Sequence, residues 1–177
     1  MSRQNYSVEC KSRKQLRFLA EKVREILDLS DRVMFPIVGL LDIFSKTFDN
    51  FSYEIVEDDQ LPDDIHAETD IMSGHVTIKQ SVYDGACEGN GRDRMTIAHE
   101  ICHYITRCTL GFRVQRNFGK EIRPCEDPEW HAKCMAGELM ISKRLTKNMD
   151  PLEIAEACGV SFDAARYQYG IFRSEEE

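Results

Sequence analysis

Apolar residues recur three and four positions apart in the N-terminal part of the chain, which is the spacing of one face of an α-helix. One set predicts an amphipathic helix over residues 12–28: Leu16, Leu19, Val23, Ile26 and Leu27. The next set predicts a second helix, capped by Asp31 and with Pro36 near its first turn. Its apolar positions are Ile37, Leu40, Leu41, Phe44 and Phe48.

The pattern then changes to one typical of strands. Ser52–Val56 is rich in aromatic and β-branched residues, and Val76, Ile78 and Val82 alternate with polar residues. We therefore expect strands at 52–56 and 75–82. Residues 84–90 contain glycine and are predicted to form a loop.

Two longer helices are predicted next, joined by a basic, irregular connection over residues 111–125. The first covers about residues 94–108. The second begins at Asp127-Pro128, an N-cap followed by a proline in the first helical position. Its apolar stripe consists of Ala132, Met135, Ala136, Leu139 and Met140.

The tail predicts two short helices. The first starts at Asp150-Pro151 and ends at Gly159, and Ser161 can cap the second, which runs through Tyr167. The pair resembles a helix-turn-helix unit, but basic side chains are few, which favours a helical hairpin that closes the domain. We divide the chain into a main domain, residues 1–147, and a C-terminal helical unit, residues 148–177.

Composition narrows the classes of function. The chain has 177 residues and a formal net charge of −8, so direct DNA binding, which needs dense Lys and Arg, is not expected. No targeting segment and no membrane-spanning run is visible, so we expect a cytoplasmic protein. The cysteines are odd in number and form no C-x-x-C pair, which favours reduced and mainly buried side chains over disulfides: Cys10, Cys87, Cys102, Cys108, Cys125, Cys134 and Cys158.

His99-Glu100-Ile101-Cys102-His103 has the pattern H-E-x-x-H within a predicted helix. Residues four apart on a helix differ by about 40° in direction, so both imidazoles face one point. Two neutral imidazole nitrogens suit Zn²⁺, and Glu100 can take the proton of a metal-bound water. The pattern predicts one zinc ion per chain; the alternative is a pair of ordinary helix histidines.

A catalytic zinc site needs a third protein ligand. Glu129 lies on the apolar stripe of its helix, where burial of an unpaired carboxylate is costly and a metal would compensate it. Glu138 and His131 lie off the stripe and are expected at the surface. Cys125 and Glu126 precede the helix and remain open as alternatives. Cys102 is expected to pack in the core rather than to bind zinc or to act as a redox gate.

Two blocks, Arg92–Tyr104 and Glu129–Ser142, resemble the ImmA/IrrE-like metallopeptidase family. The family reads approximately R-x-R-F-T-x-A-H-E-x-G-H and E-x-x-A-N-x-F-A-x-x-L-L-M-P. None of the departures from these blocks removes a ligand or the base: Cys102 for Gly, Lys133 for Asn, Met135 for Phe, and Ile141-Ser142 for Met-Pro.

The resemblance implies an α+β, gluzincin-like fold, with the active-site helix packed on a small mixed or antiparallel sheet. It also implies that Glu129 is the third zinc ligand and Glu100 the catalytic base, beside His99 and His103. The implied activity is that of a zinc endopeptidase that cleaves a regulatory partner, a helix-turn-helix repressor of a mobile element or stress response. By analogy, strand 75–82 is either the edge to which an extended substrate adds or a purely structural strand.

A second class of function remains open, in which the protein binds zinc and inactivates its partner without cutting it. Glu100 separates the two classes, because a purely structural two-histidine site does not need a carboxylate at that position. The residue that stabilises an oxyanion is not identifiable; Tyr104 adjoins His103 in sequence but points elsewhere on a helix.

Overall fold

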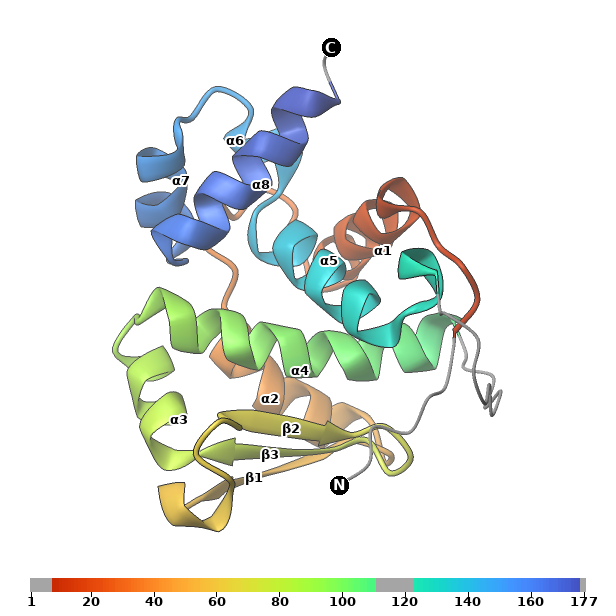
Figure 1. Ribbon diagram of the computed structural model, residues 1–177, viewed down its shortest axis with the longest axis vertical. Coiled ribbons are helices and arrows are strands. Elements are labelled where there is room, and N and C mark those ends of the chain that lie inside the picture. The colour runs from red at the N-terminus through yellow and green to blue at the C-terminus, as the bar shows by residue number, and fades with distance from the viewer. Residues whose placement is uncertain (1–7, 111–122, 176–177) are drawn as a thin grey trace.

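The computed structural model describes residues 8–110 and 123–175 and has a mixed α+β architecture. Its centre is the long helix α4 (Gly91–Leu110). In Figure 1 the sheet and α2 lie on one side of α4, and α1, α5, α7 and α8 lie on the other.

The other helices and strands have the following bounds: α1 (Arg13–Ile26), α2 (Ile37–Thr47), β1 (Ser52–Val56), β2 (Ala67–Asp70), β3 (His75–Lys79), α3 (Gln80–Cys87), α5 (Pro128–Met140), α6 (Lys143–Thr146), α7 (Pro151–Cys158) and α8 (Phe162–Ser174). Two 3₁₀ turns, Asp58–Gln60 and Pro124–Glu126, complete the described elements.

The sheet has the strand order β1-β3-β2. β1 runs parallel to β3, with Ser52 opposite His75, and β2 runs antiparallel to β3, with Asp70 opposite His75. β3 is therefore the central strand, so of the two alternatives for strand 75–82 the one that makes it an edge is wrong. Among the described residues β2 pairs with β3 alone, so β2 is an edge strand, and it packs beside α4.

The predicted strand 75–82 ends earlier, at Lys79, and the predicted loop 84–90 is largely helix α3. Val82 and Ala86 are both buried and lie four positions apart, which is helical spacing, whereas Val76 and Ile78 follow strand spacing. When a short strand is followed directly by a short helix, the few apolar positions do not show where strand spacing ends and helical spacing begins. Strand β2 escaped the sequence reading because its four residues, Ala67–Asp70, are mostly polar.

Local capping explains most helix starts. Ser12 and Gln15 form a capping box at α1, and Asp150 and Glu153 form another at α7. Asp127 accepts a hydrogen bond from the amide of Glu129 at the start of α5, as predicted. Asp31 does not cap α2, because that helix begins at Ile37, directly after Pro36.

The core is continuous through both parts of the chain. Buried residues of α4, such as Ile97 and Ile101, share one apolar cluster with the α7–α8 unit; that unit contributes Ile154, Cys158, Val160, Ala165 and Phe172. The Arg94 guanidinium donates to the carbonyls of Gly159 and Phe35, at 2.8 Å each. This side chain ties the turn between α7 and α8 to α4.

The cysteines differ from the prediction at four positions. Cys10 and Cys125 form a disulfide, and Cys87 and Cys108 are exposed thiols. The bond joins the segment before α1 to the segment before α5, and a backbone hydrogen bond from Lys11 to the Cys125 carbonyl accompanies it. Sequence spacing cannot reveal a pair 115 positions apart. The three remaining cysteines are buried, as predicted: Cys102, Cys134 and Cys158.

No helix in the described ranges, 8–110 and 123–175, is long and apolar enough to cross a membrane.

Candidate metal centre

Two of the candidate ligands come from a single turn of α4. His99 and His103 lie four positions apart, and their ring centroids are 4.6 Å apart with the planes nearly perpendicular. Their Nε2 atoms are 3.0 Å apart. The two imidazoles therefore present one nitrogen each to the same point, as the sequence spacing predicts.

The third candidate ligand comes from the first turn of α5, which packs against α4. Glu129 Oε2 lies 3.2 Å from His99 Nε2 and 3.5 Å from His103 Nε2. The Asp127 cap fixes where α5 begins, and therefore where the Glu129 side chain meets the histidines. The structure thus brings together the three ligands named from the sequence.

The geometry fits one metal ion. Tetrahedral zinc with bonds of ~2.0–2.1 Å holds its ligand atoms ~3.3 Å apart, and the three separations here are 3.0, 3.2 and 3.5 Å. A triangle with these sides has a circumscribed radius of about 1.9 Å, so one ion can reach all three atoms at ordinary bond lengths. The donor set of two imidazoles and a carboxylate is one that zinc accepts.

The electrostatics of the three groups are coupled. Hydrogen bonds from His103 and His99 hold the pKa of the Glu129 carboxyl far below its usual range, so the carboxylate is ionised. Burial of His99 opposes protonation, but Glu129 and Glu100 together outweigh it and raise the pKa of His99.

Glu100 lies beside the triad without belonging to it. Its side chain is buried, and burial raises the pKa of its carboxyl. The Thr69 hydroxyl on β2 lies 2.7 Å from Glu100 Oε2 and 3.1 Å from the Glu100 carbonyl oxygen. Thr69 thereby orients the carboxylate, a role that the sequence reading missed because β2 itself was missed.

The structure removes the alternatives for the third ligand. Cys125 is bound to Cys10, and Glu126 pairs with Arg123. His131, predicted at the surface, is buried and its Nε2 lies 2.8 Å from the Cys125 carbonyl oxygen. Glu138, also predicted at the surface, is buried between arginines of α1.

Glu129 is exposed, whereas the sequence predicted that it would be buried. The stripe places this carboxylate in the core, but its side chain is 63% exposed. Glu129 lies in the first turn of α5, and solvent reaches its carboxylate. Glu129 therefore contacts the histidines as predicted, but the prediction that its carboxylate is buried is wrong.

Two neighbours of the motif behave as predicted. Cys102 is fully buried, and burial raises the pKa of its thiol, which keeps it protonated and inert. Tyr104 points away from the triad: its ring packs against Phe44 and Phe51, and its hydroxyl donates to Asn50.

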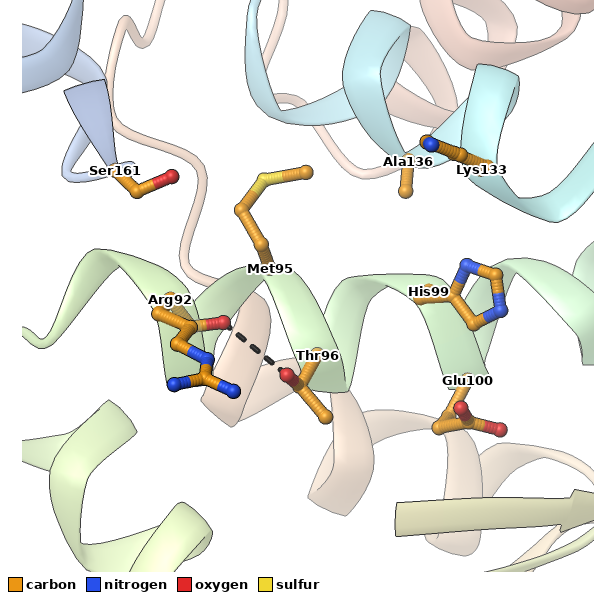
Figure 2. A pocket seen from close by; sticks show the side chains of 8 residues that line it. All are labelled: Arg92, Met95, Thr96, His99, Glu100, Lys133, Ala136 and Ser161. Carbon is orange, nitrogen blue, oxygen red and sulfur yellow. Dashed lines mark hydrogen bonds between the residues drawn. The ribbon is translucent and has the colours of Figure 1, made fainter. Parts of the chain in front are cut away.

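A pocket of about 320 Å³ lies against α4 and opens beside His99 and Glu100. Its lining residues, drawn in Figure 2, follow α4 from these two residues to Arg92, and Lys133 of α5 and Ser161, the N-cap of α8, lie across from α4. The remaining lining residues are Met95, Thr96 and Ala136. The candidate metal centre therefore adjoins a cavity.

Comparison with family models, with curated proteins and with solved structures finds no match for this chain. Its functional interpretation consequently depends on the motif and on the geometry of the site.

Proposed function

We propose that this chain is a zinc-dependent endopeptidase that cleaves a regulatory partner protein. The observation that carries the proposal is the convergence of His99, His103 and Glu129 on one point, with the buried carboxylate of Glu100 on the next position of the same helix. This combination supplies three ligands, leaves a fourth position for water, and adds a base.

Zinc, when bound, lowers the pKa of a coordinated water and polarises the peptide carbonyl. His99, His103 and Glu129 would hold the ion from three directions. Glu100 would take the proton of the attacking water and deliver it to the leaving amine. Thr69 keeps the Glu100 carboxylate in one orientation while it does so, and the buried surroundings of Glu100 keep competing water away.

The sheet supports a peptide as the substrate. Edge strand β2 lies beside α4, and its Thr69 contacts Glu100 directly. An extended peptide that paired with β2 would run past the triad with its backbone held by main-chain hydrogen bonds. This assigns to β2 the role that the sequence reading gave to strand 75–82.

The finer parts of the proposal extend the motif resemblance. A helix with H-E-x-x-H packed beside a small sheet, and a glutamate from the following helix, is the arrangement that a gluzincin-like fold requires. The resemblance also supports a helix-turn-helix repressor as the substrate, and the cytoplasm stays the compartment that the sequence predicts.

Two variants test the proposal. Zinc per chain is measured by elemental analysis for the wild type, Glu129→Ala and Glu100→Gln, and each protein is then incubated with a proteome-derived peptide library that is read by mass spectrometry for new termini. We expect about one zinc in the wild type and in Glu100→Gln, little in Glu129→Ala, and new termini with the wild type alone.

Other results have distinct meanings. Equal cleavage by the wild type and Glu100→Gln would contradict the mechanism. Zinc in the wild type without any cleavage would favour the non-cleaving binding module. A wild type that holds no zinc after reconstitution would overturn both.

A further inference from the structure

We propose that the pocket beside the triad selects peptides with an acidic side chain next to the cleaved bond, which Lys133 recognises, and that Arg92 attracts a second acidic residue farther along. The inference rests on the proposed peptidase function and names its substrate class. It is carried by the charges that line the pocket and by their distance from the metal ligands.

Apart from the proposed base Glu100, the charged residues that line the pocket are positive. Of the charged residues that line it, Glu100 is the proposed base, and Arg92 and Lys133 are both cationic. The chain as a whole carries a net charge of −8, so a cavity with two cations differs from its surroundings. A ligand that fills it is favoured when it brings negative charge.

Neither cation is paired with a carboxylate within the part of the chain that the structure describes. In residues 8–110 and 123–175 no ion pair joins Arg92 or Lys133 to a carboxylate. A guanidinium nitrogen of Arg92 lies 3.2 Å from His66 Nε2, and the Lys133 ammonium lies 5.9 Å from the centre of the Tyr167 ring. By contrast, the arginines of α1 that face Glu138 are paired.

Lys133 is close enough to the triad to contact a residue adjacent to the cleaved bond. It lies one turn beyond Glu129 on α5, about 6 Å along the helix axis, and its charge acts on His99. Figure 2 shows its ammonium directed over Ala136, along the pocket rather than away from it. An extended peptide rises ~3.3 Å per residue, so the first or second residue from the cleaved bond meets Lys133.

Arg92 lies at the far end of the same cavity. Two helical turns separate it from His99, a rise of about 10 Å, which an extended peptide covers in roughly three residues. Between the two cations the wall is neutral, with Met95, Thr96 and Ala136. The pocket therefore matches a segment with acidic residues at both ends and small or apolar residues between them.

The test uses short peptide hydroxamates, whose hydroxamate group binds zinc and whose neighbouring residue is Glu, Gln, Leu or Lys. Two series, with the hydroxamate at the C-terminus or at the N-terminus, enter the pocket from either direction. Dissociation constants are measured by calorimetry on the zinc-loaded full chain. We expect the Glu compound to bind about fivefold more tightly than the Gln compound in at least one series, as for a partly exposed ion pair.

Variants of two exposed lysines test whether Lys133 causes the preference for Glu over Gln. Lys133→Met should reduce the Glu-over-Gln ratio to less than about twofold, Lys133→Arg should retain it, and Lys147→Met removes the same charge outside the pocket and should also retain it. For a longer probe with a second acidic residue, Arg92→Met should remove the added affinity.

A Glu-over-Gln ratio near one in both series, or a ratio that survives Lys133→Met, would overturn the inference. Zinc content, measured on the same samples, separates this failure from that of the proposed function. Hydroxamates that bind zinc-loaded protein without regard to charge leave the peptidase proposal intact, whereas a chain without zinc contradicts both.

Discussion

Helix α5 carries two carboxylates that the fold treats in opposite ways. Glu138, near its C-terminal end, has no exposed side-chain surface and is bound by Arg13 at 3.2 Å and Arg17 at 2.7 Å. Glu129, in the first turn, is 63% exposed and faces two histidines. One carboxylate has permanent cationic partners, and the other has partners that are themselves candidate metal ligands.

The difference distinguishes a structural charge from a functional one. A buried carboxylate with two guanidinium partners is satisfied by the protein alone, and it fixes α5 against α1. A carboxylate oxygen that lies 3.2 and 3.5 Å from the Nε2 atoms of two histidines, with no Lys or Arg partner among the described residues, is instead placed where a cation could bind. Burial is thus a poor guide to which acidic residue does chemistry.

The largest expected effect concerns zinc. Changing Glu129 to Gln should weaken zinc binding by more than ~100-fold, because changes that merely disturb the orientation of a zinc ligand already cost ~10–100-fold. Glu138→Gln, on the same helix, is the matched control and should leave affinity within about threefold. Competition with a chromogenic chelator measures both; equal losses in the two variants would contradict the assignment of Glu129.

For the free energy of unfolding, Glu138→Gln should have a larger effect than Glu129→Gln, which is the reverse of their order for zinc binding. Glu138→Gln should lower the free energy of unfolding of the metal-free protein by about 2 kcal/mol, because Arg13 and Arg17 lose a buried partner but keep some access to water. Glu129→Gln should change it by less than about 0.5 kcal/mol, as for an exposed side chain. Urea denaturation of the chelator-treated variants measures both values, and a larger loss for Glu129→Gln would reverse the comparison.

The smallest expected effect concerns Glu175, which pairs with the same Arg17 side chain that binds Glu138. Ion pairs with Arg17 and Lys143 lower the pKa of Glu175 from its ordinary value of 4.5 to about 2. Its contribution is present above the unfolded pKa and is lost as pH falls from about 4.5 through about 2. Because the carboxylate is near the surface, we expect less than ~1 kcal/mol.

Glu175→Gln should therefore make the loss of stability on acidification less steep. Thermal unfolding at pH values from neutral to acidic compares the variant with the wild type. Parallel curves for the two proteins would show that the Glu175 ion pairs contribute nothing measurable.

The sequence predicted the local part of the site better than its surroundings. His99, Glu100 and His103 lie on one helical turn, so their geometry follows from helix spacing alone. The apolar stripe of α5 did not predict which of its polar residues are buried, because this helix packs against both α1 and α4. Residues off the stripe, such as His131 and Glu138, are consequently buried as well, and a helix covered on two sides has no clear solvated face.

Long-range pairings account for the rest of what was missed. The position of β3 between β1 and β2 depends on a parallel pairing with β1 that no local pattern reveals. Thr69 gains its role through the same sheet. The overall α+β class was nevertheless predicted, from the resemblance of the two sequence blocks to a known family, and the periodic helices and alternating strands agree with it.

The disulfide between Cys10 and Cys125 gives the chain the topology of a ring with a tail. The ring contains α1 to α4, and with them His99, Glu100 and His103. Glu129 follows the junction closely and belongs to the tail, together with α5 to α8. The candidate metal centre therefore spans the junction, and a single backbone break inside the ring still leaves its three ligands on one covalently connected molecule until the disulfide is reduced.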